Sequence, residues 1–316
     1  MKIAILSFSF LQPEHLDRLK KLGEVVEYQT TNTEEDAISR LEGAEIVVAD
    51  CWDVPLNERV LSAASSVRYV SLNSTGYNQV DLAAASKNDI SIANVPGFST
   101  DAVAELAIGL MFSVLRGIPA SDQAMHEKPF QIDPANREQD IYLGTNLRGK
   151  TLGVFGLGHI GARVAELGKG LGMNVIAYNR SPKAVEGVSM TDLDTLLASS
   201  DIISINAAFT EEHRNLIDAE VIGKMKPSAI LINTARGEFV DEAALAAAIG
   251  SKRIRGYGTD VLADWSAQNP LLSLSQVVVT PHSGFFTSEA LQNLADIIVG
   301  NIESYAAGTP RNIVNS

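Results

Sequence analysis

The stretch that decides the fold is TLGVFGLGHIG, residues 151–161. Its first five residues form an apolar run typical of a buried strand, and they lead directly into closely spaced glycines and a helical pattern. In a dinucleotide-binding βα unit, Gly156 permits the tight turn and Gly158 lets the backbone approach a pyrophosphate. Gly161 lets the helix pack closely on its strand. The sequence therefore predicts a dinucleotide site halfway along the chain.

The helix that follows this loop begins with His159 and Ile160. Free N–H groups and the helix dipole at such an N-terminus attract a diphosphate. The next predicted strand, residues 174–178, ends in Asn179, Arg180 and Ser181, without the carboxylate that NAD-binding units commonly place there. An amide, a guanidinium and a hydroxyl can all donate to a 2′-phosphate, which favours NADP over NAD. A solvated arginine on an NAD enzyme is the alternative.

Length and composition set the class of protein. The 316 residues suffice for two α/β domains, and 38 acidic against 25 basic residues leave a net charge of −13. Such a surface repels phosphate backbones, so no nucleic-acid partner is expected. Cys51 is the only cysteine, which rules out an internal disulfide. With no leader peptide and no run long enough to span a bilayer, we expect a soluble, cytoplasmic protein without membrane contact.

Short apolar runs alternate with helical patterns in both halves of the chain, and this alternation predicts an α/β fold with parallel sheets. The first half repeats the pattern without any glycine-rich loop. A helix is expected to begin near Thr100 or Asp101 and to stop by Pro119, followed by an aperiodic arm over residues 117–148 that would contact a partner subunit. A long final helix, residues 287–308, is placed back on the first half.

The predicted fold is therefore two Rossmann-like domains, with the dinucleotide-binding domain inserted into a discontinuous domain. We assign residues 1–98 and 287–316 to the discontinuous domain and residues 99–286 to the inserted one. The chain would cross between the two domains twice.

Polar residues follow the later strands of the inserted domain. Ligands of open α/β sheets bind beyond the carboxyl ends of the strands. Each residue also has a plain structural explanation, such as a helix cap, but several charged groups at successive strand ends beside a cofactor loop favour an active site. The residues at these ends are Ala207, Thr234, Arg236, Asp260 and His282.

The segments GLGHIG (156–161), ILINTARGEFVDEAALAAAI (230–249) and VVVTPHSGFFTSEA (277–290) resemble the D-isomer-specific 2-hydroxyacid dehydrogenase family. So do STGYNQVDLAAA (74–85) and NVPGFSTDAVAE (94–105), which are most similar to its glycerate dehydrogenase and hydroxypyruvate or glyoxylate reductase branch. The likeness covers about residues 45 to 300.

This resemblance implies a role for each half. The discontinuous domain would present the substrate, with the backbone amides of Ser74, Thr75 and Gly76 holding its carboxylate. Arg236 would bind and polarise a 2-keto acid, because its planar, permanently charged fork matches a carboxylate. His282 would be the general acid in reduction and the base in oxidation.

The resemblance also implies cofactor contacts along the strand ends. Asp260 would accept a hydrogen bond from the nicotinamide carboxamide. Ala207 and Thr234 would border the cofactor.

The family usually pairs its histidine with a glutamate five residues after the equivalent of Asp260, where this chain has Trp265. Two interpretations compete. Either a shortened loop brings Asp264 into the place of the glutamate, which we favour slightly, or the pair is lost and Trp265 packs the pocket. A second departure is NAAFTEEH (206–213), where the family often has a proline-containing turn.

The sequence thus predicts an NADPH-preferring, homodimeric reductase of small 2-keto acids such as glyoxylate or hydroxypyruvate, with no metal site. An NAD-dependent enzyme for another 2-hydroxy acid, including a phosphoglycerate, is the alternative within enzymes. A dinucleotide-sensing binding protein of the same fold is the alternative outside them.

Overall fold

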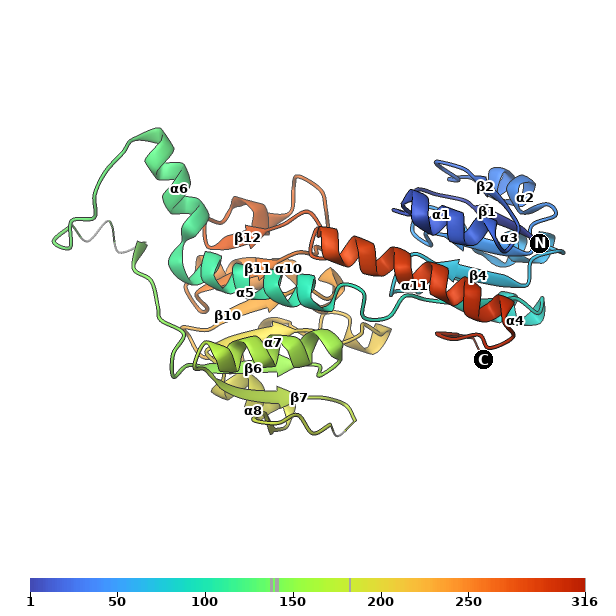
Figure 1. The fold of residues 1–316 in the computed structure, drawn as a ribbon. Coiled ribbons are helices and arrows are strands. Elements are labelled where there is room, and N and C mark those ends of the chain that lie inside the picture. Colours follow the sequence, from blue (N-terminus) through green and yellow to red (C-terminus); the bar gives the residue numbers. More distant parts are fainter. Residues whose placement is uncertain (137–138, 140–141, 182, 316) are drawn as a thin grey trace. The chain divides into compact units, whose positions relative to one another are not determined.

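The computed structural model describes residues 1–136, 139, 142–181 and 183–315 (Figure 1). Residues 137–138 and 140–141, which belong to the arm expected at 117–148, and Ser316 lie outside this part. The chain divides into two compact units: unit 1 comprises Met1–Ser99 and Phe286–Ser316, and unit 2 comprises Thr100–Phe285. The predicted fold class, with one α/β unit inserted into another, is confirmed.

Unit 1 is built on a parallel sheet with the strand order β2-β1-β3-β4-β5. In its register Ile3 lies opposite Val25 on one side and Ile46 on the other. Inner strands are continuous apolar runs because helices cover both faces. The strands are β1 (Lys2–Ile5), β2 (Glu24–Glu27), β3 (Ile46–Ala49), β4 (Tyr69–Leu72) and β5 (Ser91–Ala93).

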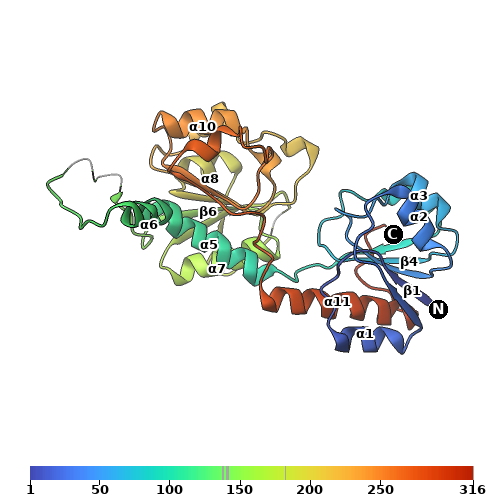
Figure 2. The ribbon, with the colours of Figure 1, turned by 90° about the horizontal axis from the view of Figure 1, so that it is seen from above.

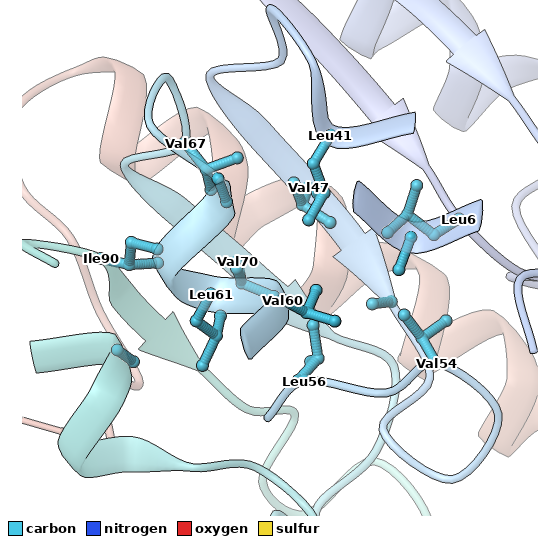
Figure 3. Packing of buried hydrophobic residues seen from close by; sticks show 14 of the residues in the cluster. Leu6, Leu41, Val47, Val54, Leu56, Val60, Leu61, Val67, Val70 and Ile90 are labelled. Atoms are coloured by element: carbon cyan, nitrogen blue, oxygen red, sulfur yellow. The ribbon is translucent and has the colours of Figure 1, made fainter. Parts of the chain in front are cut away.

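Helices α2 and α3 cover one face of this sheet, and α1 and α11 cover the other (Figure 2). Figure 3 shows the core beneath α2 and α3, where Leu41, Val47, Val60 and Leu61 interdigitate. Helix α11 packs on α1 and β4, so the end of the chain completes the first unit, as expected. The helices are α1 (Pro13–Lys20), α2 (Glu34–Leu41), α3 (Glu58–Ala63), α4 (Leu82–Lys87) and α11 (Ser288–Ala306).

Unit 2 contains a second parallel sheet with the order β12-β11-β10-β9-β6-β7-β8. The order reverses beside β6, which pairs with both β7 and β9. A reversal of this kind opens a crevice at the carboxyl ends of the strands. The strands are β6 (Thr151–Phe155), β7 (Asn174–Tyr178), β8 (Ser189–Met190), β9 (Ile202–Ile205), β10 (Ile230–Asn233), β11 (Gly256–Thr259) and β12 (Val277–Val279).

Two apolar clusters hold helices to the two faces of this sheet. Helices α5 and α7 pack on one face and α8, α9 and α10 on the other (Figure 2). The α-helices are α5 (Thr100–Arg116), α6 (Ile118–Glu127), α7 (His159–Gly170), α8 (Leu193–Ser199), α9 (Ala219–Lys224) and α10 (Glu242–Gly250). The 3₁₀ turns are η2 (Glu211–His213), η3 (Gly237–Phe239) and η4 (Pro270–Ser273).

The segment expected to be an aperiodic arm begins with a helix instead. Gly117 adopts a left-handed conformation with φ of 56° and ends α5, and Pro119 in the first turn then starts α6. No residue of α6 is buried, and α6 extends away from the sheet of its unit (Figure 1). Within the described residues no single helix meets the length and apolarity of a membrane span; α5 and α6 meet it only as a pair bent by 57°.

Candidate active site

The glycine loop after β6 has the geometry that its motif predicts. A Cβ on Gly156, which has φ of 96°, would lie 2.6 Å from the backbone of Ala207 after β9. A Cβ on Gly161 would overlap the carbonyl oxygen of Gly156. A Cβ on Gly158 would meet nothing within 4 Å, so the backbone here faces open space. Two glycines therefore close the loop and the third keeps its outer side accessible at the N-terminus of α7.

Asn179, which follows β7, is hydrogen-bonded to this glycine loop. Its Oδ1 accepts from the N–H of Leu157 at 3.1 Å, and its Nδ2 donates to the carbonyl oxygen of Ser181 at 2.6 Å. The amide that we expected to face a 2′-phosphate thus already holds two backbone segments together. Arg180 is exposed and makes no hydrogen bond or ion pair with any described residue. The guanidinium, rather than the amide, is the group that stays available to a ligand.

Lys183 is a residue that the sequence did not single out. Its Nζ donates to the carbonyl oxygen of Leu157 at 2.6 Å, which places a second positive charge against the glycine loop. The only available signal was its position four residues after Asn179, in a stretch that already contained Arg180.

Two buried polar atoms mark the neighbouring strand ends. Asn206 Oδ1, after β9, and Thr234 Oγ1, after β10, have no hydrogen-bond partner among the described residues. Buried polar atoms are rarely left unsatisfied, so an orphan in a native structure points to a ligand or water. Together with the open side of Gly158 and the cations at Arg180 and Lys183, these atoms fit a bound dinucleotide.

Arg236 follows β10 and is half-buried. Asn233 Nδ2 donates to the carbonyl oxygen of Arg236, and Arg236 Nη1 donates to that of Ala235, both at 2.8 Å. A Cβ on the next residue, Gly237, would overlap the backbone of Leu262 and Ala263. The glycine thus lets the Arg236 turn lie directly against the loop that follows β11.

His282 is held by a turn that is anchored on Asp260. Asp260, which is 2% exposed, accepts from Thr280 Oγ1 at 2.5 Å and from the N–H groups of Ser283 and Gly284 at 2.9 and 2.8 Å. Between these contacts His282 adopts a left-handed φ of 54°, an uncommon conformation for a residue other than glycine. The carboxylate that we expected to bind the nicotinamide carboxamide therefore also fixes the turn that carries His282.

The charges of Asp260 and Arg236 both affect the pKa of His282. Partial burial lowers the pKa of His282 below its usual value, the Asp260 carboxylate raises it, and the Arg236 guanidinium lowers it. His282 nevertheless remains exposed to solvent. Guanidinium, imidazole and carboxylate thus gather at one edge of the unit 2 sheet.

Asp264 does not contact His282 through any interaction among the described residues. Its carboxylate accepts from the N–H of Ser266 at 2.8 Å and from Ser266 Oγ at 2.9 Å, which closes a tight turn. The shortened loop directs Asp264 back onto its own backbone, and the adjacent Trp265 is 53% exposed. The expected pair with His282 is therefore not seen.

Glu242, the first residue of α10, organises that loop and was also not foreseen. Its two oxygens accept from the N–H of Ala263 and from Asn269 Nδ2, both at 2.8 Å. The second unusual segment is ordered as well: Thr210 and His213 form a capping box, and the His213 ring stacks on Phe239 at 5.3 Å.

Unit 1 contains the segment expected to bind a substrate carboxylate. Ser74 Oγ donates to the carbonyl oxygen of Gly76, and Thr75 Oγ1 to that of Val95, at 2.8 and 2.7 Å. These two side-chain hydrogen bonds stabilise the loop of residues 74–76. Among the described residues, the backbone N–H groups of residues 74–76 donate no hydrogen bond, so three successive donors stay available to an anion.

The described residues contain no cluster of three or more histidine, cysteine or acidic side chains that would hold a metal ion.

Comparison with known proteins relates this arrangement to one family. Residues 108–284 match the family described as D-isomer specific 2-hydroxyacid dehydrogenase, NAD binding domain. The chain is 35% identical to a glycerate dehydrogenase of Methylorubrum extorquens, over 93% of this chain and 92% of that protein. It is 33% identical to a hydroxypyruvate reductase of Blautia hydrogenotrophica, over the full length of both.

A solved structure of a reductase is also similar to this chain over nearly its whole length. An acyclic imino acid reductase, Bsp5, in complex with NADPH and D-Arg is 31% identical and superposes with a TM-score of 0.91. The match covers 99% of this chain and 100% of that chain.

Substitutions of Asp260 and Asp264 should have different effects on the pKa of the His282 imidazole. Asp260→Asn removes the carboxylate that favours the charged ring, so the pKa of His282 should fall further. Asp264→Asn should leave it unchanged, because that carboxylate faces Ser266. NMR titration of the histidine resonances measures both, with His282→Asn identifying the signal. A shift with Asp264→Asn alone would instead assign Asp264 as the partner.

Proposed function

The chain belongs to the D-isomer-specific 2-hydroxyacid dehydrogenases, which makes it a nicotinamide-dependent oxidoreductase, and on this premise we propose that it reduces a small 2-keto acid such as glyoxylate or hydroxypyruvate. The observation that carries the proposal is the gathering of Arg236 and His282 at one edge of the unit 2 sheet, where the charge of one acts on the pKa of the other. A protein that only sensed dinucleotides would need neither group.

Each group has a defined task in the proposal. Arg236 binds the keto acid and draws electron density onto the carbonyl oxygen, which makes the carbon more electrophilic. His282 gives its proton to that oxygen during reduction and takes it back during oxidation. Asp260 keeps His282 in place through the turn of residues 280–284. A bound reduced nicotinamide supplies the hydride.

The cofactor proposal uses the residues around the glycine loop. Gly156, Gly158, His159, Ile160 and Gly161 would hold the diphosphate, with Ala207, Thr234 and Asp260 along the neighbouring strand ends. Arg180, Ser181 and Lys183 would bind the 2′-phosphate of NADP, with Asn179 bracing their loop. The Arg180 guanidinium, which has no partner among the described residues, supports a preference for NADPH over NADH.

The substrate carboxylate is assigned to the unit 1 loop of residues 74–76. Three successive backbone N–H groups that donate no hydrogen bond among the described residues are suited to binding an anion. They offset the general disadvantage of binding an anion to a chain of net charge −13.

A second candidate is reduction of a 2-imino acid, the reaction class named for the structural neighbour Bsp5. The observation that favours it is the lowered pKa of His282, caused by partial burial and by the Arg236 guanidinium, at a ring that makes no contact with Asp264 among the described residues. An iminium nitrogen already carries its proton, so hydride alone completes the reaction and a neutral histidine suffices. Adding ammonium to the keto-acid assay distinguishes the two, because only imine reduction yields a D-amino acid.

Substitutions of the two central residues test the proposed function. Wild-type protein should oxidise NADPH when glyoxylate or hydroxypyruvate is added. Arg236→Lys should lower kcat/KM by about 100-fold or more, because an ammonium lacks the planar fork. His282→Asn should lower kcat by about 10²–10⁴-fold. Absorbance at the reduced nicotinamide band measures both.

The matched control is Arg214→Lys, since Arg214 is an exposed arginine of the same unit that pairs with Glu211. It should retain wild-type activity. Two results together would reject the enzyme and favour the sensor: NADPH binding without turnover of any 2-keto or 2-imino acid, and no reduction of NADP⁺ or NAD⁺ by any 2-hydroxy acid, 3-phosphoglycerate included.

Arg180→Ala tests the cofactor preference. Loss of a charge-assisted hydrogen bond of about 1.5–3 kcal/mol should raise the KM for NADPH by about 10- to 150-fold. The KM for NADH should change little, because NADH has no 2′-phosphate, and it serves as the internal control. Equal effects on both cofactors would refute the assignment.

We also propose a homodimer through α6 and the segment after it, in a protein expected to be cytoplasmic. Ile118 and Met125 are 49% and 42% exposed on a helix without buried residues. Light scattering on a sizing column should give about twice the chain mass of 33.8 kDa. The double variant Ile118→Glu, Met125→Glu should give the monomer mass, since it puts charges in the apolar contact. A monomeric wild type would contradict the dimer.

A further inference from the structure

Large aromatic side chains are exposed at the carboxyl edge of the unit 1 sheet. Phe8 follows β1, Trp52 follows β3, Tyr77 follows β4, and Phe286 precedes α11; they are 59%, 52%, 36% and 59% exposed. Scattered apolar residues need no explanation on a protein surface, but a group of aromatic rings from separate segments at one edge does.

The strand order shows why this edge is special. In the order β2-β1-β3-β4-β5 the direction of winding reverses between β1 and β3. Sheets of this order bind ligands at that reversal, beyond the carboxyl ends of the strands. Phe8 and Trp52 follow the two strands that flank it. The two loops are joined there, since the N–H of Asp50 donates to Ser7 Oγ at 3.1 Å and Asp50 Oδ1 accepts from the N–H of Trp52 at 2.9 Å.

Both aromatic loops contact the segment assigned to the substrate carboxylate. Asn73 Nδ2, one residue before that segment, donates to the carbonyl oxygen of Phe8 at 3.2 Å. Cys51, the neighbour of Trp52, places its Sγ 3.5 Å from Ser74 Oγ and 3.4 Å from the carbonyl oxygen of Gly76. Residues 74–76 thus lie in a loop that touches the Trp52 loop directly and the Phe8 loop through Asn73, all within one unit.

The phenylalanine rings form a connected surface. The Phe8 and Phe10 centroids are 4.7 Å apart with the rings edge to face, and Phe10 is 6.1 Å from Phe286. Phe10 adopts a left-handed φ of 57°, which an L-residue rarely takes. This strained backbone is maintained at a position where its side chain joins two exposed rings.

We propose that the 2-keto acid bound by this chain has an aromatic group at C3, which packs on the phenylalanine cluster of Phe8, Phe10 and Phe286 while residues 74–76 hold the carboxylate. This inference rests on the proposed reduction of a 2-keto acid and changes the preferred substrate from a small acid to an aromatic one. Glyoxylate and hydroxypyruvate would then be turned over as poor substrates. An aromatic ring gains both from apolar burial and from edge-to-face contact with the phenylalanines.

The test compares phenylpyruvate with pyruvate, which differs only in lacking the ring, and with glyoxylate, all with NADPH. Wild-type kcat/KM should be at least about tenfold higher for phenylpyruvate than for pyruvate, the size of effect that an apolar pocket provides. Phe8→Ala should reduce that ratio by about tenfold, and Phe8→Tyr should restore it. Phe8 is exposed, so its truncation should not unfold the chain. Glu58→Ala, an exposed change on α3 of the same unit, is the control and should keep the ratio.

The outcomes distinguish failure of the aromatic substrate class from failure of the proposed 2-keto acid reduction. A phenylpyruvate advantage that depends on Phe8 supports the aromatic substrate class. Pyruvate or glyoxylate used as well as phenylpyruvate, or an advantage that survives Phe8→Ala, overturns this inference and leaves the keto-acid reductase intact. Failure to oxidise NADPH with any of the three acids contradicts the proposed function itself.

Discussion

The site in unit 2 depends on one buried carboxylate. Asp260 lies at the end of β11 and accepts three hydrogen bonds from the turn after β12. That turn contains His282 in a left-handed conformation, which costs about 1–3 kcal/mol. Hydrogen bonds to a charged acceptor contribute about 1.5–3 kcal/mol each and offset this cost. The same charge opposes the lowering of the His282 pKa by partial burial and by the Arg236 guanidinium, so Asp260 both positions the imidazole and favours its charged form.

Both units apply the same architectural rule to different ligands. In each parallel sheet the winding reverses at one point, and the residues suited to binding a ligand follow the strands that flank this point or the strand next to them. In unit 2 these are the glycine loop after β6 and the buried polar atoms after β9 and β10. In unit 1 they are aromatic rings and a run of free amides. The first suits a charged, polar cofactor, and the second suits a small acid with an apolar group.

The positions of residues in the glycine loop and at the strand ends could be foreseen, because sequence order alone determines those positions in a parallel sheet. Gly156, Gly161, Arg236 and His282 are of this kind. Side chains that act through a contact distant in sequence could not. The direction of Asp264 depends on how a shortened loop closes on Ser266, and nothing in the local pattern determines that closure.

The sequence by itself determined the fold class and the glycine loop, because apolar periodicity and glycine spacing are local properties that allow few backbone solutions. Its quoted segments carried the resemblance to the family. Only the tertiary structure decided that Asn179 braces the glycine loop, that Lys183 reaches Leu157, and that a helix begins after Gly117. The tertiary structure also decided that Phe8, Phe10 and Phe286 lie together at the carboxyl edge of the unit 1 sheet. Those outcomes depend on packing between segments that lie tens of residues apart or on the choice between two allowed local conformations, and a one-dimensional pattern does not contain that information.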